Sequence, residues 1–320
     1  RSDTEVESLR ASASSVVDRD NEINVRALDS GTLSERVATA LQLLDDGGTI
    51  RIPRPEGGGR WDWGTQLDIE TGNYRGVTLQ FDRGVEVEYS NDGWCLTLTA
   101  PTRWGQRNTF AIRGRDAEFN AGPATDPNGF VRADDVAHFT TEINTRGFQN
   151  SAGDSTAILL RNVANFSEGY RISGDHRGCD IGLDFAPATV TGGSGTKSFV
   201  DGRVENLSIN YHELGIRIRG DHNANVFDNV VFFPEADGAT GIEFAGNCSD
   251  TIFHGPRWDG PESVTNTAMA FASDFVAFGG RPVPYGPKFK GVDNVVESNG
   301  KGDAVFFVGT YNEEGQPPGI

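Results

Sequence analysis

The 320-residue sequence predicts an all-β protein: a right-handed parallel β-helix with three strands per rung and an N-terminal α-helical cap. Three observations lead to this fold class. Phenylalanine recurs every 26 to 33 residues, a second series of short strand-like segments runs out of phase with it, and a third strand fits between the two. Such a period is typical of a solenoid, in which each repeat buries its apolar face against its neighbours.

The phenylalanine series marks one strand of each repeat. No segment after residue 50 has the ten or more residues of helical periodicity that a helical repeat would need. The series therefore predicts short strands. Its members are Phe110, Phe139, Phe166, Phe199, Phe227 and Phe253.

The other two series complete the predicted rung. In the second series apolar and polar residues alternate, as in a strand with one buried face. It consists of residues 129–132, 156–160, 182–185, 215–218, 241–244 and 267–271. The third strand is clearest at residues 116–119, 206–209 and 229–232. Asparagine begins two of these segments, and it tolerates the left-handed backbone of a tight turn.

A helical cap is predicted at the N-terminal end, where an open rung would expose strand edges and core. The sequence Thr32-Leu-Ser-Glu35 resembles a capping box, which satisfies the first backbone groups of a helix. Glycines at 47 and 48 end this helix. Its apolar stripe consists of Leu33, Val37, Ala40, Leu41 and Leu44.

Four segments follow from these patterns. Residues 1–22 form an N-terminal arm or an oligomerising helix, because their apolar residues have helical spacing but short isolated helices are marginally stable. Residues 23–53 form the N-terminal cap and first strand. Residues 54–278 form the β-helix repeats, and residues 279–320 form a C-terminal closing segment.

The net charge of −18 argues against nucleic acid as a partner, because nucleic-acid binding needs a basic surface. At ordinary ionic strength this much like charge destabilises a compact fold. At molar salt the Debye length falls to about 3 Å and the repulsion is screened. Only four of the 28 basic residues are lysines. This composition favours an extreme halophile, with an ordinary acidic protein as the alternative.

No cofactor and no metal ion are expected. The three cysteines, Cys95, Cys179 and Cys248, are odd in number and have no metal-like spacing, so buried free thiols are predicted. The sequence contains no run of about eighteen apolar residues, so no membrane span is expected.

The start of the chain shows a family resemblance. A helix, then Gly47-Gly-Thr-Ile-Arg-Ile-Pro53, then irregular β repeats resembles the pectate-lyase-like β-helix superfamily. Within that superfamily it is most similar to tailspike, tail-fibre and surface-projection proteins of tailed viruses. Residues 24–53 carry the resemblance, and the repeats that follow agree with it.

With the halophilic composition, the resemblance implies a structural or receptor-binding projection of a haloarchaeal tailed virus. This would be a spike, a fibre or a turret-like structure on the virion surface, in high salt. It would form a homotrimer, contact other virion proteins and bind a glycan or glycoprotein of the host surface. The alternative is a secreted haloarchaeal polysaccharide lyase or glycoside hydrolase, since one fold supports many functions.

Carboxylates are the candidate catalytic groups of the enzymatic alternative, because glycoside hydrolysis commonly uses two of them. The weak candidates are Asp134, Asp135, Asp175 and Asp184. Asp134-Asp135 resembles one element of the polygalacturonase-like motifs, but the Gly-His-Gly element is missing. Solvated turn residues are the simpler interpretation of Asp134 and Asp135, and turn chemistry also explains Gly174-Asp175.

Aromatic and charged residues are the candidates for ligand binding. Trp61 and Trp63 lie on one face of a strand, where exposed rings can stack on sugars; a role in the core or in a subunit contact is the alternative. Tyr211 and His212 are expected in a turn between two strands.

A charged row is the last candidate. If Asp184, Arg217 and Glu243 occupy one face of three successive rungs, they form either a salt-bridge stack or a sugar-binding face.

Overall fold

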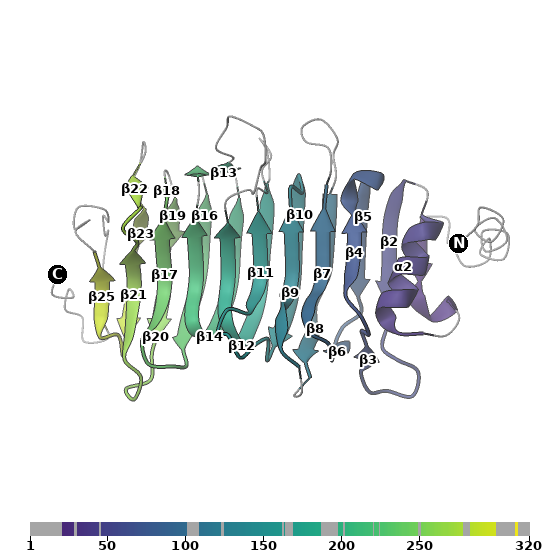
Figure 1. Ribbon diagram of the computed structural model, residues 1–320, viewed down its shortest axis with the longest axis horizontal. Helices are drawn as coiled ribbons and strands as arrows, with labels where there is room; N and C mark the ends of the chain where they lie inside the picture. The colour runs from purple at the N-terminus through teal and green to yellow at the C-terminus, as the bar shows by residue number, and fades with distance from the viewer. Residues whose placement is uncertain are drawn as a thin grey trace.

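The computed structural model is a parallel β-solenoid, mostly β, with one short α-helix near the N-terminal end (Figure 1). No helix in the described part of the chain is both long and apolar enough to cross a membrane. The structure describes residues 21–28, 31–44, 46–100, 109–122, 125–161, 163, 169–186, 198–200, 202–219, 221–223, 225–248, 251–277, 282–298 and 311–312.

The strands stack in parallel into three long ladders, A, B and C. Several long strands bend around a corner and contribute to two or three ladders. Ladder A contains β1 (Glu22–Asn24), β2 (Gly47–Ile52), β5 (Gly76–Phe81), β19 (Ile252–His254), β23 (Val283–Tyr285) and the first residues of β8 (Thr109–Ala121), β10 (His138–Arg146), β12 (Tyr170–Ala186), β14 (Arg203–Arg219) and β16 (Val226–Pro234).

Ladders B and C form the other two sides of the coil. Ladder B contains β3 (Trp61–Asp62), β6 (Glu86–Tyr89), β20 (Arg257–Asp259), β24 (Lys288–Lys290), β26 (Tyr311–Asn312) and later residues of β8, β10, β12, β14 and β16. Ladder C contains β4 (Leu67–Glu70), β7 (Gly93–Thr99), β9 (Pro127–Asp134), β11 (Thr156–Arg161), β17 (Ala239–Ala245), β21 (Asn266–Phe271), β25 (Asn294–Glu297) and the last residues of β12 and β14.

A fourth, shorter sheet adds to these three ladders in the C-terminal half. It contains β13 (Ser198–Val200), β15 (Asp221–Asn223), β18 (Asn247–Cys248) and β22 (Val276–Ala277). These strands lie in the chain between ladder C and the next strand of ladder A. The repeats that contain them therefore have an additional strand beyond the predicted three.

The second sequence series is ladder C, as predicted. Its central residues are in register from rung to rung and are buried: Val131, Ile158, Leu183, Ile216, Ile242 and Met269. Period-two alternation identifies these strands because a shift by one residue would turn the whole apolar set outward.

The phenylalanine series is only partly one row. Phe110 pairs with Phe139 in ladder A, and Phe227 pairs with Phe253. Phe227 also pairs with Val204, and this row lies one inward position further along the strands than the row of Phe110 and Phe139. Phe199 lies in the fourth sheet, and Phe166 lies outside the described residues. Any large apolar side chain of suitable volume fills an inward position, so residue type alone does not fix the register.

The N-terminal helix α2 (Leu33–Leu43) is present where predicted, at the end of the ladders (Figure 1). The Glu35 carboxylate accepts a hydrogen bond from the Thr32 backbone N–H at 2.9 Å, which is the expected capping interaction. Leu33, Val37 and Leu41 are buried against the first rungs. The helix therefore covers the open end of the apolar core.

The structure describes little of the predicted N-terminal segment and more of the C-terminal one. Of residues 1–22, the structure describes only Asn21 and Glu22, so the predicted arm or helix lies outside the described residues. In residues 279–320, β23, β24 and β25 continue the three ladders beyond residue 278.

The core consists of stacked apolar and aromatic side chains. Trp258 lies between Phe232 and Phe289, with ring centroids 5.0 and 4.9 Å away and nearly parallel planes. Cys95 and Cys179 are buried free thiols, and burial raises the pKa of both.

Asparagines line the corner between ladders A and B. Asn206 and Asn229 have φ angles of 50° and 54°, the left-handed conformation expected of turn asparagines. The Asn229 side chain donates a hydrogen bond to the Asn206 side chain at 2.9 Å. This stacking connects the corners of successive rungs.

Candidate functional site: a groove on ladder A

The predicted Asp134–Asp135 pair lies at the end of β9. The Asp134 carboxylate accepts a hydrogen bond from Arg132 Nε at 2.7 Å and lies 3.9 Å from Arg161 Nε. Asp135 has a φ of 60°, and its backbone N–H donates to the Arg161 carbonyl at 2.9 Å. The turn interpretation holds for Asp135. Asp134 is held in an ion-pair cluster instead of being solvated.

The charged row forms as the sequence predicted. Asp184, Arg217 and Glu243 are in register on β12, β14 and β17. Arg217 Nη1 lies 3.8 Å from Asp184, and Arg217 Nε lies 3.5 Å from Glu243. Arg219 Nε also donates to Asp184 at 3.0 Å. The Asp184 side chain is only 5% exposed, whereas that of Glu243 is 32% exposed. The row is therefore a salt-bridge stack in which the buried Asp184 carboxylate pairs with both Arg217 and Arg219.

Asp184→Asn is expected to lower the free energy of unfolding by about 1.5–3 kcal/mol, the usual contribution of hydrogen bonds to a charged group. Glu243→Gln, at the more exposed end of the same row, is the matched control and should cost less than about 1 kcal/mol. Denaturant unfolding in molar KCl measures both. Equal losses in the two variants would contradict the larger contribution of the buried Asp184 carboxylate to stability.

Asp175 lies on the ladder B part of β12. Its carboxylate accepts from Arg177 Nε at 2.6 Å, and its backbone N–H donates to the Asn144 side chain at 3.0 Å. The next residue, His176, is fully buried, with Nδ1 2.8 Å from the Thr145 hydroxyl. Burial lowers the pKa of His176 from 6.5 to about 4. This imidazole belongs to the core, so Asp175 has no accessible histidine beside it.

Two of the predicted ligand-binding aromatics are core residues, which corrects the prediction. Trp63 is 1% exposed, and its indole N–H donates to the Cys95 carbonyl at 3.1 Å. Tyr211 is fully buried with its ring edge-on to Phe232, and burial raises its pKa. Neither ring presents a face to a ligand. Both fill inward positions of ladder B or the adjoining corner.

Trp61 and His212 are more accessible but already have partners. The Trp61 indole donates to the Pro53 carbonyl at 2.7 Å, and the guanidinium of Arg36 lies 5.3 Å from its ring centroid. His212 Nε2 lies 3.1 Å from Glu235. His212 lies within the continuous strand β14, and the expected turn at 211–212 is absent there because β14 passes from ladder B to ladder C without interruption.

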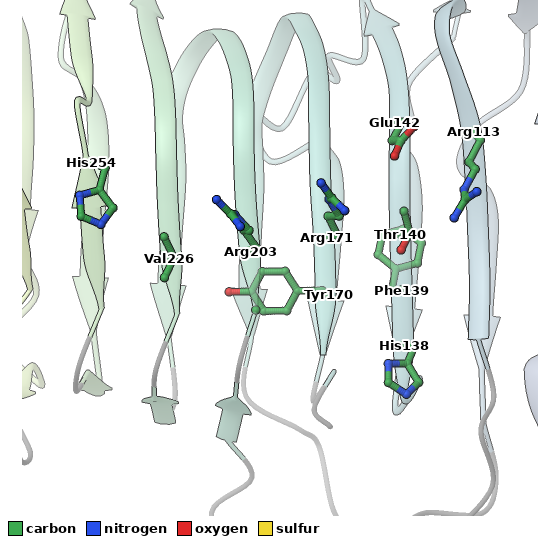
Figure 2. Close-up of a pocket in the computed structure, with 11 residues that line it drawn as sticks. Arg113, His138, Phe139, Thr140, Glu142, Tyr170, Arg171, Arg203, Val226 and His254 are labelled. Atoms are coloured by element: carbon green, nitrogen blue, oxygen red, sulfur yellow. The ribbon is translucent and has the colours of Figure 1, made fainter. Parts of the chain in front are cut away.

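A groove lies on the outer face of ladder A, across strands β8 to β19 (Figure 2). Its cavity has a volume of about 540 Å³. We call this surface the ladder-A groove. It is lined by Arg113, His138, Phe139, Thr140, Glu142, Tyr170, Arg171, Gly202, Arg203, Val226 and His254.

Strand register aligns the polar lining. Thr140, Arg171 and Arg203 are paired on β10, β12 and β14, and Val226 continues the row on β16. Each alternates with an inward apolar residue, because successive side chains of a strand point to opposite faces. The row therefore presents a hydroxyl, two guanidinium groups and an apolar side chain in one line.

Buried hydrogen bonds fix one wall of the groove. The Tyr170 hydroxyl donates to the Asn225 side-chain oxygen at 2.9 Å, and the Gly202 backbone N–H donates to the same oxygen at 3.0 Å. A Cβ at position 202 would lie 2.0 Å from the Tyr170 ring, so only glycine permits this close approach. Contacts within the chain thus hold this wall in place.

Charges in the groove fall into two groups. Arg171 Nε donates to Glu205 at 2.6 Å, and Arg203 Nε lies 3.2 Å from the same carboxylate. Arg113 and Glu142 face each other in register on β8 and β10, but neither forms an ion pair with any residue that the structure describes. Arg113 and Glu142 therefore keep hydrogen-bonding capacity for a ligand.

The groove residues were not among the sequence candidates. A signal for them exists: arginines follow or precede inward apolar residues in ladder A, as in Ile112-Arg113, Tyr170-Arg171 and Arg203-Val204. Within the described ranges no group of three or more His, Cys, Asp or Glu side chains could hold a metal ion.

The chain is thus a parallel β-solenoid with a polar groove on one outer face. No protein-family model and no curated protein matches the sequence. Among solved structures, the chain is similar to the catalytic domain of a GH87 α-1,3-glucanase in complex with nigerose, with 10% sequence identity and a TM-score of 0.31. The match covers 88% of this chain and 67% of that chain. The resemblance is distant and concerns the fold alone.

Proposed function

We propose that this protein is a structural, receptor-binding projection of a haloarchaeal tailed virus, and that the ladder-A groove holds a glycan of the host surface. The groove itself is the observation that supports this proposal. Its guanidinium, imidazole, hydroxyl and carboxylate groups include both hydrogen-bond donors and acceptors, which a sugar chain needs. They lie on the strands of a sheet, which is a rigid support for a binding site.

The shape of the fold suits a linear ligand. Strands of neighbouring rungs are about 4.8 Å apart, so equivalent outward positions recur in a line. We propose a right-handed coil with three strands in its basic rung, since parallel crossover connections are right-handed in nearly all proteins. Successive sugar units would lie across successive rungs.

Composition supports a location on a virion surface in high salt. The net charge of −18 and the near absence of lysine suit molar ionic strength, where self-repulsion is screened. The proposed assembly is a homotrimer that contacts other virion proteins. Light scattering in molar KCl should give the mass of a trimer; a monomer that binds no haloarchaeal envelope would contradict the proposal.

A secreted polysaccharide lyase or glycoside hydrolase is the second candidate. Glu142 and His138 favour it, because both line the groove from strand β10. Glycoside hydrolysis commonly uses two carboxylates, and Glu142 is the sole carboxylate among the described lining residues, so binding is the better supported function. Release of reducing ends or unsaturated sugars that stops in Glu142→Gln would favour the enzyme.

Arg113→Ala is expected to weaken binding to haloarchaeal envelope polysaccharide by roughly tenfold or more, because a hydrogen bond to a charged group contributes about 1.5–3 kcal/mol. Titration calorimetry in molar KCl measures the affinity. Arg83→Ala is the matched control: Arg83 is highly exposed, pairs with Asp116 at 2.8 Å and does not line the groove. Equal affinities of both variants and the wild type would rule out the groove as the binding site.

A further inference from the structure

An exposed aromatic pair adjoins the ladder-A groove at its C-terminal side. Tyr285 on β23 is 40% exposed, and no other large hydrophobic side chain among the described residues is as exposed. Its ring stacks on that of His254, with centroids 5.4 Å apart and planes at 24°. His254 also lines the groove (Figure 2), so the pair and the groove form one continuous surface.

Strand pairing holds the backbone of the pair, and two glycines follow the rings. His254 and Tyr285 are in register on β19 and β23, and the Gly255 N–H donates to the Tyr285 carbonyl at 2.8 Å. Gly255 and Gly286 follow the two rings with φ angles of 57° and 58°. A Cβ at either glycine would have no atom within 4 Å. The space directly beside these two glycines is therefore open among the described residues.

The outward row of Thr140, Arg171 and Arg203 continues next to the pair. Val226, Ile252 and Val283 are in register on β16, β19 and β23 and are half-buried. Along this row the side chains change from threonine and arginine to valine and isoleucine. In the neighbouring row the carboxylates of Glu205 and Asp228 are followed by the rings of His254 and Tyr285. Isolated apolar residues are common on surfaces, but a continuous group with an exposed stacked ring is typical of a binding surface.

We infer that His254 and Tyr285 form an aromatic subsite that receives the apolar face of a sugar ring at the far end of the ladder-A groove. This inference rests on the proposed function. One face of many pyranose rings carries several C–H groups, which an aromatic ring with its negative π-face attracts. Six strand spacings separate Arg113 on β8 from Tyr285 on β23, roughly 29 Å in all. The ligand is therefore a chain of several sugar units, bound by polar groups at one end and by stacking at the other.

Chain-length dependence tests the subsite. The probe is polysaccharide released from haloarchaeal envelopes and fractionated into short chains, which span the polar rungs only, and long chains, which also reach Tyr285. Tyr285→Ala should weaken the binding of long chains roughly three- to tenfold and leave short chains unchanged. Tyr285→Phe, which keeps the ring, should bind like the wild type. Thermal unfolding of each variant in molar KCl verifies that the fold is kept.

The outcomes separate the subsite from the groove. If Arg113→Ala weakens binding of both fractions but Tyr285→Ala changes neither, the subsite is wrong and the proposed function stands. If the wild type binds neither fraction, the proposed function fails, and the inference fails with it. If Tyr285→Ala weakens both fractions equally, the two ends are not separate subsites and the inference is wrong.

Discussion

Trp258→Ala is expected to lower the free energy of unfolding by about 3–5 kcal/mol, the range for removing a large aromatic side chain from a core. Trp258 is 1% exposed and is stacked between Phe232 and Phe289 in the interior of ladder B. The alanine would leave a cavity between two rings that cannot close it, because the strands above and below are fixed at the sheet spacing.

Chemical denaturation in molar KCl, followed by circular dichroism, measures this loss. Trp258→Phe is the control, since the smaller ring keeps the stack and removes an indole N–H that has no hydrogen-bond partner among the described residues. It should cost about 1 kcal/mol. A loss below about 1 kcal/mol for the alanine variant would show that the stack contributes little. Because each rung contacts only its neighbours, unfolding in more than one step is compatible with the prediction.

Stability is expected to fall as the pH is lowered from 6.5 to 4, in part through His176. This residue is fully buried, and burial lowers its pKa to about 4, against 6.5 for a solvated imidazole. Between these values the unfolded chain binds a proton that the folded chain does not. The stabilisation that depends on neutral His176 is therefore fully present above pH 6.5 and is lost as the pH falls to 4. At 1.36 kcal/mol per pH unit the total loss is about 3 kcal/mol.

His176→Asn separates this effect from the titration of the many carboxylates. The asparagine can keep a hydrogen bond to Thr145, which contacts His176 Nδ1 at 2.8 Å, but it has no proton to bind in this pH range. The difference in unfolding free energy between the wild type and the variant should shrink by about 3 kcal/mol from pH 7 to pH 4. A difference independent of pH would mean that His176 is not buried in its neutral form.

The solenoid could be predicted because its repeat is visible in single segments. The rows of ladder C, such as Ile158, Leu183 and Ile216, follow from alternation within a few residues. The fourth sheet could not be predicted, because its two- and three-residue strands leave no such alternation. The expected turn at Tyr211 and His212 was wrong for a related reason: a strand can bend around a corner without a turn residue, as β14 does.

The groove could not be located from the sequence for a different reason. Its lining residues are far apart in the chain and meet only through strand register. That register shifts between Glu142 and Asn144 and between Ile172 and Gly174, so counting residues from one repeat to the next places side chains on the wrong row. The stack of Asp184, Arg217 and Glu243 could be predicted because the strand register around these residues is regular. Each charged residue lies between two inward apolar residues that pair with their counterparts on the next strand.

Nearest-neighbour stacking of the rungs has a consequence for how such a molecule changes over evolutionary time. Duplication or deletion of one repeat inserts or removes a layer without altering the contacts inside the others. Each added layer would lengthen the rod by about 4.8 Å and add one more set of outward positions along ladder A. The length of the rod and the number of outward positions along ladder A would therefore grow in fixed proportion, while the cross-section of the rod stays constant.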